Sequence, residues 1–221
     1  MTVWLAIDTA TDFVGVALHG GARVPDEATV PTRRRHTALL APLVAAMLER
    51  HALAVADLAG VAVAIGPGSY TGLRAGLAFA KGLWVAAGTP VFGVPTLDVL
   101  AAPLSAPVVA RDAPLWAVMG AGRTRLVAAC YPPSPGDWPD PASLEAWTAD
   151  DLLSAAAPPA WVAGEIADDL RARLEAAGLR VLPAAAGLRR AGWLAELGRA
   201  RAAGGAPADP ARLSPVYLGG A

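Results

Sequence analysis

The chain has 221 residues, of which 55% are hydrophobic and 17% are charged, and its formal net charge is −1. This composition supports a large apolar core and excludes a protein whose overall charge attracts nucleic acid. Its single cysteine, Cys130, excludes an internal disulfide. With no signal peptide expected and no run of roughly 18 apolar residues that would span a membrane, we expect a cytoplasmic protein.

The first half of the chain alternates between predicted strands and helices. Apolar runs bounded by turn residues predict strands at 3–8, 13–18, 22–30, 60–65 and 91–94. Helical periodicity predicts helices at 37–51, 71–87 and 96–104. Thr37 and Thr96 are the expected N-caps, Gly88 the expected end of the second helix, and Pro25 favours an edge position for the third strand.

The second half continues the pattern after a Pro- and Ala-rich stretch at 103–114. We interpret this stretch as the boundary between domains at 1–104 and 105–221. Strands are expected at 115–120, 124–131, 160–164 and 179–183, and helices at 149–156, 165–176 and 190–202. Strands and helices in both halves indicate an α/β protein.

An internal similarity links the two halves at an offset of 111 residues. Aligning residues 5–18 with residues 116–129 matches Ala6 with Ala117, Ile7 with Val118, Ala10 with Ala121, Val16 with Val127 and Ala17 with Ala128. Two interpretations fit: a chance agreement of Ala-rich hairpins, or a duplicated domain in which each copy opens on a hairpin.

The turn between the first two predicted strands is a candidate nucleotide contact. Asp8 could hold a metal ion there, and the hydroxyls of Thr9 and Thr11 could bind phosphate oxygens. A complete site of the actin and sugar-kinase type needs a second such hairpin, where Met119 takes the place of Asp8 and cannot bind a hard cation. The alternative interpretation is a structural turn.

The glycine-rich loop "GPGSYTGL" precedes the second helix of the chain. It lacks the Gly-Lys-Ser/Thr of a P-loop, and the next strand lacks the acidic residue of a dinucleotide-binding fold. Ser69 lacks the flanking glycine of a nucleophile elbow. The loop backbone at Gly68, Ser69 and Thr71 remains a candidate anion contact at a helix N-terminus.

Two helices carry features of packing surfaces. Gly72, Gly76 and Ala80 recur every four residues, so another backbone could approach closely, either from the protein's own sheet or from a helix of a second chain. The large apolar residues of the first helix also recur at helical spacing. Side by side, the two helices could form half of an intermolecular four-helix bundle. The three histidines form no metal-binding pair, so no transition-metal site is expected.

With these motifs in view, the chain resembles the TsaB (YeaZ) family. The resemblance lies in "LAIDTATDFVGVAL", "RRRHTALLAPLV", "GPGSYTGLRAGLAFAKGL", "GVPTLDVLA" and the terminal "PVYLG". It covers the first half nearly continuously and touches the end of the chain.

The resemblance implies an actin-like (ASKHA, ribonuclease H-like) duplicated fold with a degenerate second domain. It also implies a role in making N6-threonylcarbamoyladenosine (t6A) in tRNA, as a non-catalytic scaffold. Such a scaffold binds the catalytic paralogue TsaD, helps to recruit the ATPase TsaE, meets tRNA only through the complex, and forms a homodimer when alone. By analogy, the partner surface would fall on Leu40, Leu43, Met47, Leu73, Gly76, Leu77 and Ala80.

The resemblance implies no cofactor in the isolated chain, with ATP or ADP as a candidate ligand at the interface with the catalytic partner. Two positions depart from the family pattern: "VMGAG" at Val118–Gly122 replaces an "IDAR" type stretch, and Gly219 replaces an arginine. Two other functions are weighed: a nucleotide-dependent kinase or hydrolase of the actin-like ATPase superfamily that uses Asp8 and the glycine loop, and a structural dimer with no tRNA role.

Overall fold

The structure, a computed structural model, describes residues 2–21, 26–32, 35–104, 112–122, 124–133, 138–205 and 210–218. The chain forms two compact units. Unit 1 comprises Met1–Val99 and Arg190–Val216, and unit 2 comprises Leu100–Arg189 and Tyr217–Ala221. This division differs from the expected domains 1–104 and 105–221, because the segment 190–216 returns to unit 1. Most of the stretch interpreted as a boundary, residues 105–111, lies outside the described residues.

Unit 1 is built on a five-stranded sheet of order β3-β2-β1-β4-β5. Its strands are β1 (Val3–Asp8), β2 (Phe13–His19), β3 (Asp26–Pro31), β4 (Leu58–Gly66) and β5 (Val91–Pro95). Strand β1 pairs antiparallel with β2 and parallel with β4, which pairs parallel with β5. The edge position expected for the third strand is confirmed, although Pro25 itself lies outside the described residues.

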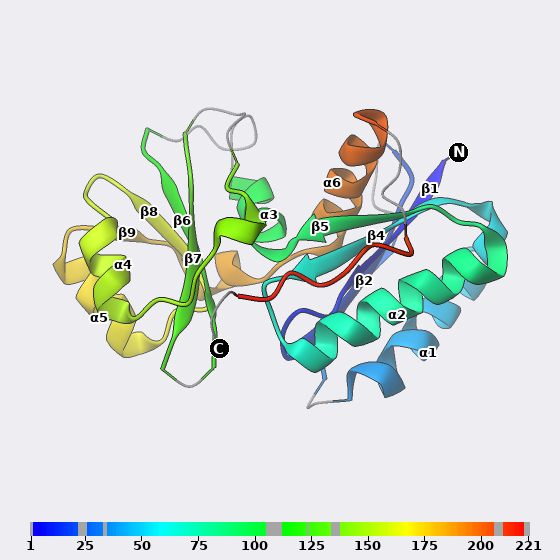
Figure 1. The fold of residues 1–221 in the computed structure, drawn as a ribbon, viewed down its shortest axis with the longest axis horizontal. Coiled ribbons are helices and arrows are strands. Elements are labelled where there is room, and N and C mark those ends of the chain that lie inside the picture. Colours follow the sequence, from blue (N-terminus) through cyan, green and yellow to red (C-terminus); the bar gives the residue numbers. More distant parts are fainter. Residues whose placement is uncertain are drawn as a thin grey trace. The chain divides into compact units, whose positions relative to one another are not determined.

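Helices cover both faces of this sheet (Figure 1). Helices α1 (His36–Arg50) and α2 (Tyr70–Ala87) lie side by side on one face, and α6 (Ala191–Ala203) packs on the other. Side chains of β1 alternate between these two cores: Leu5 and Ile7 pack toward α1 and α2, and Trp4 and Ala6 pack with α6. These contacts with the sheet place α6 in unit 1.

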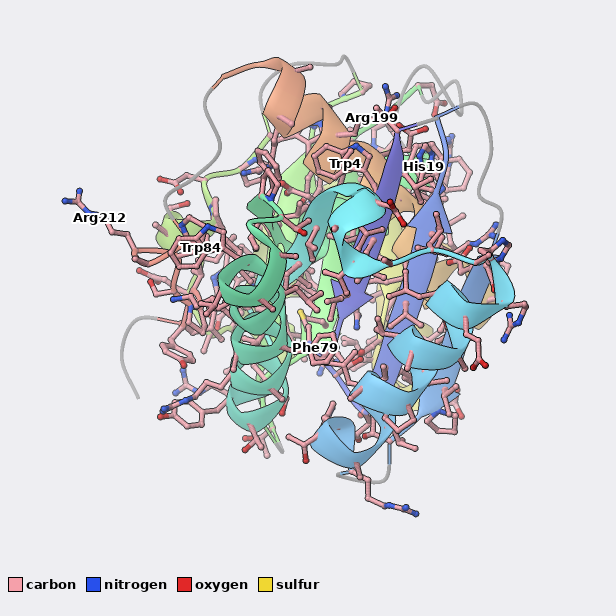
Figure 2. All side chains as sticks on the ribbon, turned by 90° about the vertical axis from the view of Figure 1, so that its right-hand side faces the viewer. Trp4, His19, Phe79, Trp84, Arg199 and Arg212 are labelled. Carbon is pink, nitrogen blue, oxygen red and sulfur yellow. The ribbon has the colours of Figure 1, made fainter. Side chains whose placement is uncertain are left out.

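Small residues let α6 approach the sheet closely. A Cβ added at Gly198 would lie 2.4 Å from the Cβ of Ala62 on β4. At the same helix, Nε2 of the buried His19 lies 2.8 Å from the Glu196 carboxylate, which also pairs with Arg199. Figure 2 shows Trp4, His19 and Arg199 together on this side of the sheet. The returning helix is therefore fixed by close packing and by the contact between His19 and Glu196.

The ends of α1 and α2 follow different rules. Thr37 is not the N-cap of α1, as we expected, because the helix begins one residue earlier at His36, after Arg35, whose side chain makes no capping hydrogen bond. The His36 ring is buried, and its Nε2 lies 2.7 Å from the Thr11 carbonyl oxygen. That contact holds the start of the helix in place of a cap. Gly88 ends α2 in the left-handed conformation, as predicted.

Unit 2 holds a four-stranded sheet of order β7-β6-β8-β9. Its strands are β6 (Leu115–Gly120), β7 (Leu126–Tyr131), β8 (Trp161–Gly164) and β9 (Arg180–Val181), and its main helices are α4 (Ala149–Ala155) and α5 (Asp168–Ala176). The remaining elements of the whole fold are α3 (Thr96–Ala101) and four 3-10 turns. The turns are η1 (Val55–Asp57), which lies in unit 1, and η2 (Ala102–Leu104), η3 (Pro141–Ser143) and η4 (Ala184–Gly187). Helix α5 begins three residues later than predicted.

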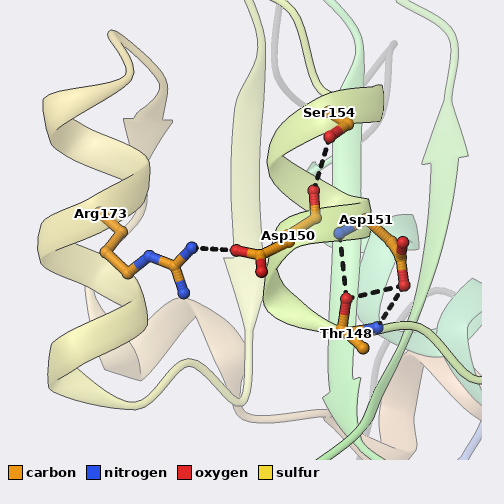
Figure 3. A network of polar contacts seen from close by, with 5 residues as sticks. All are labelled: Thr148, Asp150, Asp151, Ser154 and Arg173. Atoms are coloured by element: carbon orange, nitrogen blue, oxygen red, sulfur yellow. Dashed lines mark hydrogen bonds and ion pairs between the residues drawn. The ribbon is translucent and has the colours of Figure 1, made fainter.

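A capping box starts α4 (Figure 3). The Asp151 amide donates to the Thr148 hydroxyl (3.2 Å), while the Thr148 amide and hydroxyl both donate to the Asp151 carboxylate (2.8 Å each). The hydrogen bond from the Thr148 amide, and after it the one from the Thr148 hydroxyl, holds the pKa of Asp151 below its usual value. The neighbouring Asp150 pairs with Arg173 of α5, so the two helices are tied together at this end.

The topology of unit 2 repeats that of unit 1. In unit 1, β1 pairs antiparallel with β2 and parallel with β4, and β4 pairs parallel with β5. In unit 2, β6 pairs in the same way with β7 and β8, and β8 pairs parallel with β9. No counterpart of β3 occurs among the described residues of unit 2. The expected actin-like, ribonuclease H-like duplicated α/β fold with a degenerate second copy is confirmed.

The predicted offset of 111 residues between the two copies does not fit both strands of the hairpins. Ala6 lies opposite Ala17 in the β1–β2 pair, whereas Ala117 lies opposite Ala129 in the β6–β7 pair. The offset of 111 residues would have placed Ala128 there. The second hairpin is therefore one residue longer between its paired strands.

Candidate functional site

The turn between β1 and β2 packs directly on the glycine loop that begins α2. The Thr9 hydroxyl donates a hydrogen bond to the Gly72 carbonyl oxygen (2.8 Å), and the Ser69 amide donates to the Ala10 carbonyl oxygen (2.7 Å). The Asp8 carboxylate accepts from the Ala10 amide at 2.9 Å, which closes the turn. The two motifs that the sequence analysis treated as separate candidates therefore form one site.

The glycines of the loop make this contact possible. A Cβ added at Gly68 would lie 2.4 Å from the Ala10 carbonyl oxygen, and one added at Gly72 would lie 2.1 Å from the Thr9 carbonyl oxygen. At Gly76 it would lie 2.2 Å from the Thr9 hydroxyl oxygen. Of the two alternatives for the small-residue stripe, the structure shows the first: the close neighbour is the protein's own β1–β2 turn.

The loop is also held from its strand side. The Gly66 amide donates to the Thr96 hydroxyl at 3.1 Å, and Thr96, which we expected as an N-cap, is itself the first residue of α3. The Val216 amide donates to the Ile65 carbonyl oxygen at 2.7 Å. Gly66 has a φ of +116°, and an added Cβ would lie 2.3 Å from the Val216 carbonyl oxygen. The C-terminal segment thus packs on the entry of the loop.

The residues predicted to contact an anion divide by burial. Asp8 and Thr9 are buried, Thr11 and Gly68 are half-buried, and Ser69 and Thr71 are exposed. The Ser69 amide is already engaged by Ala10, and its hydroxyl accepts from the Gly72 amide at 3.3 Å as the N-cap of α2. Much of the hydrogen-bonding capacity expected for a phosphate is therefore used within the protein. An anion contact stays a prediction.

The residues predicted to form the partner surface lie mainly in the core of unit 1. Those that are buried are Leu40, Met47, Leu73, Gly76, Leu77 and Ala80. Leu43 alone among the seven is half-buried. The large apolar side chains of α1 and α2 face the sheet because that is where the most apolar area leaves water. Buried side chains of this kind do not present a surface to a second chain.

The outward face of the same two helices has a different composition. Its exposed residues are small and uncharged over most of its length: Ala38, Ala41, Pro42, Ala45 and Ala46 on α1, and Ala78, Gly82, Val85 and Ala86 on α2. Val85 is 77% exposed. We call this set the outer helical face. Sequence reasoning missed it because the large residues dominated the periodic pattern, although the recurrent alanines on the opposite side were a readable signal.

The second hairpin carries no equivalent of the first turn among the described residues. Met119, at the position of Asp8, is buried in unit 2. The Gly120 amide donates to the Glu165 carboxylate at 3.3 Å, and that carboxylate lies 3.6 Å from the buried Arg189. Gly219 lies outside the described residues.

Two kinds of feature are absent from the described residues. No group of three or more His, Cys, Asp and Glu side chains there is placed to hold a metal ion. None of the helices that the structure describes has both the length and the apolar character to cross a membrane.

Comparisons with known proteins agree with this fold. A family model described as TsaD, tRNA N6-adenosine threonylcarbamoyltransferase, matches residues 20–133, more than half of the chain. An uncharacterised protein of Mycobacterium tuberculosis is 45% identical over 98 residues, covering 43% of this chain and 46% of the relative. The tRNA threonylcarbamoyladenosine biosynthesis protein TsaB of Escherichia coli is 38% identical over 97 residues, covering 44% of this chain and 42% of that protein.

The matched part is less than half the length of these curated relatives. Among solved structures, YeaZ from Pseudomonas aeruginosa has a TM-score of 0.78 at 25% identity. That likeness covers 99% of this chain and 100% of the YeaZ chain. The similarity in structure therefore extends over both units.

Proposed function

Because this chain belongs to the threonylcarbamoyltransferase family, as a member of its TsaB (YeaZ) branch, we propose that it is a subunit of the complex that makes t6A in tRNA. Its role there is that of a non-catalytic scaffold. It binds and activates a TsaD-like catalytic paralogue, helps to recruit a TsaE-like ATPase, and meets tRNA only through the complex.

The observation that carries this proposal is the outer helical face. Exposed alanines, glycine and proline on two neighbouring helices let another helix pair approach closely, and few charges must be desolvated there. Pro42 belongs to the same exposed side of α1. Because proline has no amide N–H, the Ala38 carbonyl lacks its usual helical partner there. This combination fits the half of a four-helix bundle that a second chain completes.

The family model supports a paralogue as that second chain. Its match includes both α1 and α2, so a catalytic relative of the same fold has the corresponding helices. Two chains of one fold can meet through equivalent faces around a two-fold or pseudo-two-fold axis. The same face would serve a homodimer when the paralogue is absent.

The packing of the glycine loop supports a role without catalysis in the isolated chain. The β1–β2 turn and the α2 N-terminus satisfy each other, where a nucleotide-dependent enzyme would direct these groups to phosphates. No cofactor is proposed for the isolated chain, and ATP or ADP at the interface with the paralogue stays a prediction, as does a cytoplasmic location.

Reconstitution tests the proposal. Modification of tRNA by the TsaD-like paralogue and the ATPase is measured with and without this chain, and we expect modification to depend on it. Modification that proceeds equally well without the chain would refute the scaffold role. ATP turnover by the isolated chain that is lost in Asp8→Ala would instead support the kinase or hydrolase alternative.

A further inference from the structure

The side of α2 that faces away from α1 carries positive charge without any negative charge. Between Leu58 and Leu97 the sequence contains no Asp or Glu, and its only cationic residues are Arg74 and Lys81. They are seven residues apart in α2, so they lie on one side of the helix, about 10 Å apart along its axis. A chain with a net charge of −1 thus has one helix that is purely cationic.

The C-terminal segment extends this positive charge. Lys81 Nζ donates to the Ala211 carbonyl oxygen at 3.4 Å, so residues 210–216 run along the same side of α2. The segment is anchored by Leu213, which packs on the core, and by the bond from the Val216 amide to the Ile65 carbonyl oxygen. Residues 210–218 contain no acidic residue and one cation, Arg212, whose side chain extends outward in Figure 2.

Arg74 and Lys81 differ from most other described cations in their partners. Arg50, Arg173, Arg180, Arg190, Arg199 and Arg201 each pair with a carboxylate. Within the part of the chain that the structure describes, no carboxylate lies within 4.0 Å of Arg74 or Lys81. The Arg74 guanidinium lies 5.1 Å from the Tyr70 ring centroid and donates to its hydroxyl, which holds it at the surface.

These cations border the outer helical face. Ala78 and Val85, two of its exposed members, lie on the turns of α2 next to Arg74 and Lys81. A helical interface with an apolar centre and charged flanks chooses its partner through those flanks. We call Arg74, Lys81 and Arg212 the cationic edge.

We propose that the cationic edge selects a partner whose matching helices carry carboxylates, and that it disfavours pairing with a second copy of this chain. This inference rests on the proposed function, because it takes the outer helical face as the docking surface. A second copy brings the same cations to the interface, and its α2 carries no carboxylate; the one carboxylate of α1 and α2 is Glu49, in the last turn of α1, so few ion pairs can form between two copies. An acidic helical surface instead forms ion pairs with the cationic edge as the apolar centres meet.

Opposite salt dependences follow from this arrangement. Salt screens attraction and repulsion alike at exposed flanks. Raising KCl from 50 to 500 mM should therefore raise the Kd for the catalytic paralogue by about tenfold, mainly through slower association. The homodimer Kd should stay unchanged or fall over the same range.

Charge reversal provides the direct test. Arg74→Glu with Lys81→Glu should slow association with the paralogue by about tenfold or more at 50 mM KCl and remove most of its salt dependence. Arg74→Gln with Lys81→Gln should give an intermediate effect. The control, Arg125→Glu, reverses an exposed charge in unit 2 and should leave association at the wild-type rate. Circular dichroism establishes that each variant is folded.

The outcomes separate this inference from the proposed function. A wild-type chain that does not bind the paralogue at any salt concentration refutes the proposed function. Binding that is equally tight for the wild type and the reversal variant, with equal salt dependences, overturns only the charge selection. A reversal variant that assembles normally but weakens tRNA binding by the complex also overturns it, since the cationic edge would then contact RNA.

Discussion

Substituting Gly72 by alanine tests the contact that joins the β1–β2 turn to α2. The added Cβ would lie 2.1 Å from the Thr9 carbonyl oxygen, whereas ordinary contacts of such atoms are 3.4 Å or longer. Because the obstructing atom belongs to the backbone, no side-chain rotation relieves the overlap. The turn and the helix must separate by more than 1 Å, which endangers the bond from the Thr9 hydroxyl to the Gly72 carbonyl oxygen.

The magnitude follows from two opposing terms. Overpacking costs typically about 1–3 kcal/mol, and an obstructing backbone atom favours the upper end of that range. Alanine recovers about 1 kcal/mol through its higher helix propensity. We therefore expect Gly72→Ala to lower the free energy of unfolding of unit 1 by about 2 kcal/mol.

Gly82 provides the matched control in the same helix. An added Cβ there meets nothing within 4 Å, so Gly82→Ala keeps the propensity gain without the clash. It should raise the free energy of unfolding by roughly 0.5–1 kcal/mol. Urea unfolding followed by far-UV circular dichroism and tryptophan fluorescence measures both variants. A Gly72→Ala protein as stable as Gly82→Ala would refute the close approach of turn and helix.

Two further predictions concern the packing of α6 and the acid response of unit 2. Gly198→Ala should destabilise unit 1, because the new Cβ would lie 2.4 Å from that of Ala62, and Ala62→Gly in the same chain should restore part of the loss in a double-mutant cycle of unfolding free energies. Additive effects would contradict that contact. The Asp112 carboxylate accepts hydrogen bonds from Arg180 (2.9 and 3.0 Å) and from the Trp161 indole (3.3 Å), and these lower its pKa below 3.8. The stabilisation that the ionised Asp112 carboxylate gives the folded state is therefore present above pH 3.8, and it is lost as the pH falls through the lowered folded-state pKa. Acid unfolding profiles should show a shallower loss below about pH 4 for Asp112→Asn than for the wild type, and parallel profiles would contradict this role.

Most elements of the fold could be predicted because their signals are local. Continuous apolar runs marked β1, β2 and β4, and a glycine in the left-handed conformation marked the end of α2. The start of α1 could not be read in this way. His36 begins the helix through a contact with the Thr11 carbonyl, 25 residues away in the chain, which no local capping rule anticipates.

The return of α6 to unit 1 was equally hidden. Apart from Leu194, its buried residues are small, including Ala191, Ala195 and Gly198, so they give little hydrophobic periodicity. Their fit becomes apparent only against the alanines of β1 and β4. The domain boundary near residue 104 was inferred from composition, and composition does not show that α6 packs with unit 1.

The candidate site shows the same limit. The sequence identified both the β1–β2 turn and the glycine loop, but their mutual hydrogen bonds depend on tertiary packing. The partner surface on α1 and α2 stays a prediction, and most of the residues assigned to it, such as Leu40 and Met47, are large. Those face the sheet, and the small residues on the opposite side are the exposed ones.

The central claim, docking of the catalytic paralogue on the outer helical face, is tested most directly at Ala78. This residue is exposed, so Ala78→Glu should leave the fold intact. The new carboxylate would lie one turn from Arg74 and Lys81, but burying it in the interface still requires its desolvation, which would weaken the heterodimer by about 3 kcal/mol, or roughly 100-fold in Kd. Ala78→Ser and Ala200→Glu, the latter on the exposed side of α6, serve as controls. Sedimentation equilibrium with the paralogue should show loss of the heterodimer for Ala78→Glu alone, and a wild-type Kd for that variant would contradict the account.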